Sequence, residues 1–169
     1  FSLCSSSIEM LYSNSDVNIS SCNFSASSEN AIHMDQTQSD IAIEKCQFFG
    51  NSAGVRLGNG KYRIIFDSNI FHSGKQGAIL FSEDNILIII RDCHFTNHRR
   101  AIFANNGNLQ VTVTSCSFQN ITHTTIELIS DNENWSILKS NFNDNNRTIS
   151  ASLLNNLFKI DSWHFSDSL

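Results

Sequence analysis

Two carboxylates and a guanidinium stand at equivalent points of a regular spacing. Glu44, Asp67 and Arg91 lie 23 and 24 residues apart, and each directly follows an apolar residue. Side by side, the carboxylates could hold Ca²⁺, which prefers several carboxylate oxygens. Because two acids are few for such a site, a solvated row of mixed charge is the alternative. These three residues are the catalytic candidates of the chain.

Four cysteines share another point of the same spacing. Cys22 and Cys46 are 24 residues apart, Cys93 and Cys116 are 23 apart, and Cys4 is the fifth cysteine. The spacing does not match the paired C-x-x-C frame of zinc sites, and free cysteine is a small, well-buried residue. We therefore predict an inward column of thiols, although neighbouring strands about 4.8 Å apart would allow a disulfide. Asn69 and Ser140 stand at the same point of other repeats and are expected to face inward and bond to the backbone. We predict no metal site and no cofactor.

The histidines stand at different points of the spacing. We expect surface positions for them rather than a metal site, which would need several to converge. One of them begins the basic run His98-Arg99-Arg100, which is either a solvated turn or a contact for an acidic glycan or a phosphate. The six are His33, His72, His94, His98, His123 and His164.

The spacing itself is the main feature of the sequence. Phenylalanine recurs every 23 or 24 residues, with apolar residues five and seven positions before it and a second apolar pair after it. Apolar and polar residues alternate within each piece, which indicates strands, and no piece has a helical period. The recurring residues are Phe1, Phe24, Phe48, Phe71, Phe95, Phe118, Phe142 and Phe165.

Such a repeat predicts a coil of parallel strands. Hairpins would not return the same residue type to the same point of each repeat, whereas a coil stacks equivalent residues about 4.8 Å apart. We predict an all-β parallel β-helix solenoid of about seven rungs, with 23–24 residues and three short strands in each. Residues 1–169 are expected to form a single domain. Because no capping segment is recognisable, we expect an internal slice of a longer chain, with flanking rungs beside it.

The frame Val17-Asn18-Ile19-Ser20-Ser21-Cys22-Asn23-Phe24 resembles the right-handed parallel β-helix of the pectin-lyase-like superfamily. The resemblance covers the whole chain and implies the right-handed coil. In pectate-lyase-like enzymes, acidic residues on a strand face hold calcium and a nearby arginine abstracts a proton. The resemblance thus implies these roles for Glu44, Asp67 and Arg91, whereas the motifs of polygalacturonase-like enzymes are missing from the sequence.

A second, fainter similarity is to chlamydial polymorphic membrane proteins and related protist surface proteins. Those proteins carry F-x-x-N and G-G-A-I repeats. Phe48-Phe49-Gly50-Asn51 and Phe142-Asn143-Asp144-Asn145 resemble the first repeat, and Gln76-Gly77-Ala78-Ile79 partly resembles the second. This similarity implies a β-helical surface protein.

Outward positions carry the information about partners, since inward positions must be apolar for the coil to close. Most outward positions are polar, but Ile65 and Ile89 share one outward column, and Leu80 and Phe103 share another. Contiguous exposed apolar residues often mark a contact. We predict that at least one pair is a binding site, covered by another chain or by another part of this one.

Composition narrows the function. Lys and Arg number 11 against 16 Asp and Glu, a net charge of −5 that argues against nucleic-acid binding, and no apolar stretch is long enough for a membrane span. The leading hypothesis is a non-catalytic structural or interaction module of a larger extracellular or cell-surface protein, which adheres to or binds a glycan or protein. The alternatives are a polysaccharide lyase or hydrolase fragment and a scaffold subunit of a large intracellular assembly.

Overall fold

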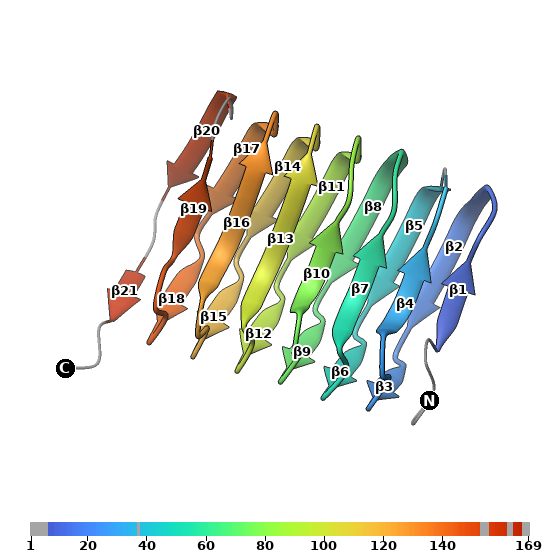
Figure 1. Ribbon diagram of the computed structural model, residues 1–169, viewed down its shortest axis with the longest axis horizontal. Helices are drawn as coiled ribbons and strands as arrows, with labels where there is room; N and C mark the ends of the chain where they lie inside the picture. The colour runs from blue at the N-terminus through green and yellow to red at the C-terminus, as the bar shows by residue number, and fades with distance from the viewer. Residues whose placement is uncertain (1–6, 37, 153–155, 162–163, 167–169) are drawn as a thin grey trace.

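The alternating apolar residues form strands, and the strands coil into a parallel β-helix. A computed structural model describes residues 7–36, 38–152, 156–161 and 164–166. All regular structure in these ranges is β, arranged as three sheets of seven parallel strands that wind around one axis (Figure 1). None of the described segments is a helix of the length and hydropathy that crossing a membrane requires. The predicted all-β solenoid with three strands per rung is confirmed.

Each rung contributes one strand to each sheet, and we name the sheets after their first strands. The β1 sheet contains β1 (Ile8–Met10), β4 (Asn30–Met34), β7 (Ala53–Leu57), β10 (Gly77–Phe81), β13 (Arg100–Asn106), β16 (Thr124–Ser130) and β19 (Ile149–Ala151). The β2 sheet contains β2 (Asn14–Ser20), β5 (Gln38–Glu44), β8 (Lys61–Asp67), β11 (Ile86–Arg91), β14 (Leu109–Thr114), β17 (Glu133–Leu138) and β20 (Asn156–Asp161). The β3 sheet contains β3 (Asn23–Ser25), β6 (Gln47–Phe49), β9 (Ile70–His72), β12 (His94–Thr96), β15 (Ser117–Gln119), β18 (Asn141–Asn143) and β21 (His164–Ser166).

The core is a set of stacked columns. Phe71 pairs in register with Phe48 on one side and with Phe95 on the other. From Phe24 to Phe142, successive ring centroids are 4.6–5.0 Å apart, and the ring planes differ by 10° or less. These six side chains are 0–2% exposed. The predicted phenylalanine stack is confirmed for the described rungs.

Most residues with a positive φ angle lie at the corners between sheets, and the others lie near the start of the β2-sheet strands. Twenty described non-glycine residues have such a φ, which is uncommon for side chains with a Cβ. Lys45, Ser68 and Asp92, for example, repeat the same turn on three rungs with φ of 52–54°. Each costs about 1–2 kcal/mol of conformational strain. Because the strain recurs on every rung, burial of the stacked core must outweigh it.

Polar ladders satisfy the backbone inside the corners. Asn69, predicted as an inward polar rung of the cysteine column, accepts the N–H of Cys46 at 2.9 Å and donates to the carbonyl of Ile43 at 2.7 Å. Ser140 holds the equivalent place two rungs beyond Cys93 and accepts the N–H of Cys116 at 3.2 Å. Both predicted polar rungs are therefore confirmed.

A second ladder, which the sequence analysis missed, closes the corner before the β2 sheet. Asn85, Asn108 and Asn132 are 0–1% exposed. The side-chain oxygen of Asn108 accepts both the N–H and the Nδ2 of Asn85, and Asn108 bonds to Asn132 in the same way. Their intervals of 23 and 24 residues were the signal that could have identified them.

Candidate functional site

The three catalytic candidates lie on the outer face of the β2 sheet. Glu44 pairs in register with Asp67, and Asp67 with Arg91. The Arg91 Nε and Nη2 atoms donate to Asp67 Oδ2 at 2.9 and 2.6 Å. The structure thus brings these residues together, as the spacing predicted.

The geometry defines what this column can do chemically. The hydrogen bond from Arg91 holds the pKa of Asp67 below its ordinary value, and the same bond raises the pKa of Arg91. A general acid or base works best with a pKa near the ambient pH. Asp67 is thus held deprotonated and Arg91 protonated. The two side chains neutralise each other as an ion pair.

The thiols form an inward column without a disulfide among the described residues. Cys46, Cys93 and Cys116 are 0–1% exposed, and Cys22 is half-buried. The thiols of Cys46, Cys93 and Cys116 lie 3.2–3.3 Å from the carbonyls two residues before them, as hydrogen-bond donors. The predicted free thiol column is confirmed, and Cys4 lies outside the described residues.

These thiols are poor metal ligands as they stand. Burial raises the pKa of Cys46, and the neighbouring Cys93 thiol together with burial raises the pKa of Cys116. Metal binding needs the thiolate, which both shifts disfavour. Across the described ranges, no three His, Cys, Asp or Glu side chains converge as a metal site would require.

The expected surface position of His98 is wrong. Its side chain is 3% exposed, and Nδ1 accepts the N–H of Gly74 at 2.9 Å. Burial lowers its pKa to about 4. His98 lies inside the corner because the third residue after each phenylalanine points inward, and the basic run that it begins is therefore only partly solvated.

The two apolar pairs differ in their surroundings. Ile65 and Ile89 are register partners on the β2 sheet, where Ile89 is 37% exposed. Leu80 and Phe103 are register partners on the β1 sheet, half-buried in the wall of a hollow of about 380 Å³. Arg56 lines the same hollow, and the sequence analysis missed it. The signal was its register position, one rung before Leu80.

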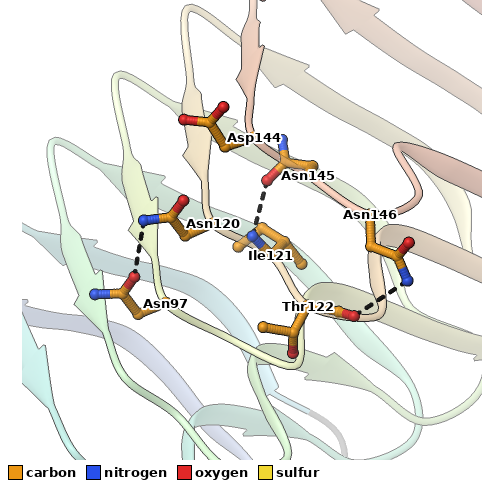
Figure 2. A pocket seen from close by; sticks show the side chains of 7 residues that line it. All are labelled: Asn97, Asn120, Ile121, Thr122, Asp144, Asn145 and Asn146. Atoms are coloured by element: carbon orange, nitrogen blue, oxygen red, sulfur yellow. Dashed lines mark hydrogen bonds between the residues drawn. The ribbon is translucent and has the colours of Figure 1, made fainter. Parts of the chain in front are cut away.

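Another hollow, of about 900 Å³, lies at the corner that follows the β3 sheet (Figure 2). Its polar groups are largely bonded within the corner. Asn120 Nδ2 donates to Asn97 Oδ1 at 3.2 Å, and Asn145 Oδ1 accepts the N–H of Ile121 at 2.9 Å. Asn146 Nδ2 donates to the carbonyl of Thr122 at 3.2 Å. Because these bonds connect neighbouring rungs, we assign the polar side chains of the hollow to the structure of the turns rather than to a binding site.

The comparisons with known proteins agree with the fold. The model of a family described as "Periplasmic copper-binding protein (NosD)" matches residues 2–164. No curated protein and no solved structure gives a significant match. The match confirms the resemblance to right-handed parallel β-helices of the pectin-lyase-like superfamily, while the similarity to polymorphic membrane proteins stays a prediction. Because the matched region spans nearly the entire sequence, the chain belongs to the NosD family of parallel β-helix proteins.

Proposed function

We propose that this chain is a non-catalytic β-helix module, a rigid rod that presents its outer faces to a partner outside the cytoplasm. The family description places its members in the periplasm, which supports an envelope or extracellular location. The uninterrupted core columns support a structural role, because each rung is buried only through contact with its neighbours. Cell fractionation tests the location, and recovery in the cytoplasm would contradict it.

The observation that carries the non-catalytic assignment is the ion pair between Asp67 and Arg91. This pair fills the column in which the sequence placed the candidate catalytic groups. A lyase would need a free base and open carboxylates in that column. The Arg91 guanidinium instead forms an ion pair with Asp67, and Glu44 is the one other candidate beside the pair.

Copper, which the family description names, finds no group of three converging His, Cys, Asp or Glu side chains among the described residues of this chain. Soft thiolates and imidazoles are the usual copper ligands. Here the buried thiols donate to backbone carbonyls, and His98 uses Nδ1 to accept a backbone N–H. We therefore assign these side chains to the fold and derive no copper chemistry from them.

A depolymerisation assay tests the proposal. The full chain is incubated with polygalacturonate and Ca²⁺, and unsaturated products are followed by ultraviolet absorbance. We expect no rate above that of buffer, for the wild type and for Asp67→Asn alike. Thr112→Ala, on the same sheet face, is the matched control. A wild-type rate that Asp67→Asn abolishes and Thr112→Ala preserves would establish a catalytic function instead.

A further inference from the structure

Two adjoining hollows form a groove on the outer face of the β1 sheet. The first, of about 380 Å³, is lined by Leu80, Phe103 and three arginines. The second, of about 450 Å³, adjoins it, because Arg56 and Ser82 line both. The groove therefore extends along the axis of the coil and crosses several rungs, as an extended ligand would require.

The floor of the first hollow is apolar. Leu80 and Phe103 face outward on β10 and β13 as direct register partners, and such neighbours on one sheet face lie in contact. The Arg100 guanidinium lies 5.1 Å from the centroid of the Phe103 ring. Arg100 also pairs with Glu127, which anchors it against the sheet. One face of the aromatic ring is therefore already occupied by a cation.

The rim of the groove is positively charged. Arg56 and Arg99 are exposed, and neither has an ion-pair partner within the described part of the chain. Asp35 lines the second hollow, where its Oδ1 accepts the N–H of Gln36. The chain as a whole carries a net charge of −5. Two arginines without an ion-pair partner among the described residues thus lie beside an apolar floor, in a chain whose net charge is negative.

We propose that this groove binds an acidic segment of a partner protein, in which an apolar side chain lies beside carboxylates. The proposal deepens the interaction role proposed above and rests on it. Guanidinium forks bind carboxylates bidentately, and Leu80 with the exposed part of Phe103 would receive the apolar side chain. A peptide matches this floor better than a glycan, because sugar rings pack on open aromatic faces and Arg100 covers one face of Phe103.

The test uses the full chain and the peptide Asp-Glu-Leu-Asp-Glu-amide, labelled with fluorescein at its N-terminus, with anisotropy as the readout. We expect saturable binding that weakens as salt is raised, since exposed charges are screened. The double variant Arg56→Gln/Arg99→Gln should weaken binding about tenfold or more. A peptide with Ser in place of Leu should also bind more weakly. Arg147→Gln, an exposed arginine outside both hollows, is the matched control and should bind like wild type.

Three results would overturn the proposal. They are absence of peptide binding, an equal loss in Arg147→Gln, and tighter binding of oligogalacturonate of the same charge at the same arginines. The last result would assign the groove to a glycan. None of these results would contradict the proposed non-catalytic function, because the depolymerisation assay tests residues on a different sheet. Circular dichroism of each variant confirms that the coil is retained.

Discussion

Lowering the pH from 7.5 to 5 is expected to destabilise the fold through one buried histidine. His98 occupies the corner position that Asn51 and Asn145 occupy on other rungs. Each asparagine accepts an N–H from the preceding rung and donates to a carbonyl of that rung. His98 performs the first task through Nδ1, which accepts the N–H of Gly74. Its ring must therefore be neutral, with the proton on Nε2.

The magnitude follows from the two pKa values of His98. Burial lowers the folded-state pKa to about 4, although contacts with the backbone of Phe71 and Gly74 oppose the shift, and the unfolded value is about 6.5. As the pH falls, the unfolded chain binds the proton first, so the stability that neutral His98 contributes above pH ~6.5 is lost down to pH ~4. The full loss is about 3 kcal/mol, with about 2 kcal/mol between pH 7.5 and 5. The lowered pKa of Asp67 places its titration below this window.

Urea unfolding at the two pH values measures the effect. We expect the free energy of unfolding of the wild type to fall by about 2 kcal/mol from pH 7.5 to 5. His98→Asn should keep the corner bond to Gly74 without titrating. Between pH 7.5 and 5, the free energy of unfolding of this variant should therefore fall by less than about 0.5 kcal/mol. His94→Asn, at an exposed histidine, should behave like wild type. A wild-type stability that is constant over this range, or an equal loss in His98→Asn, would refute the reasoning.

Two further predictions concern the corners. Ala26 has φ of 57° and Ala42 lies on β5, so Ala26→Gly should relieve strain while Ala42→Gly weakens a strand. The two free energies of unfolding should differ by about 1–2 kcal/mol, and equal destabilisation would contradict the strain argument. Asn108→Ala leaves buried polar groups of the asparagine ladder without their hydrogen-bond partner, and should lower the free energy of unfolding by about 2–4 kcal/mol. Asn18→Ala, at an exposed position, should lower it by about 0.5 kcal/mol or less. Calorimetry giving both the same small cost would show that the ladder is not needed.

The repeat made the fold predictable. Phenylalanine at constant intervals identifies one column, and the period-2 alternation around it identifies the flanking strands. Once the fold is a coil, the register of every outward residue follows, so the sequence alone places Glu44, Asp67 and Arg91 as neighbours. The confirmed column of Cys46, Cys93 and Cys116 rests on the same register.

The corners were harder to predict, because their inward positions tolerate several residue types. Other rungs have Ser27, Asn51, Gly74 and Ile121 at the position of His98. Because these residues share no type, the sequence does not show that the position is buried. What these positions share is a backbone task that Asn and His can both perform. An offset of three from each phenylalanine would have identified His98 as a relative of Asn51. Residue type alone assigned it to the surface.

The register also determines which charges remain available to a partner. In a coil, each outward residue lies beside its equivalents on the two adjacent rungs. Arg91 therefore lies beside Asp67, and the two charges neutralise each other on the β2 sheet. Arg56 lies instead between His33 and Leu80, so neither of its register neighbours is a carboxylate. An arginine is thus paired in one column and free to bind in another, which is why the β1 sheet, rather than the column of Glu44, Asp67 and Arg91, is the better place to seek a partner.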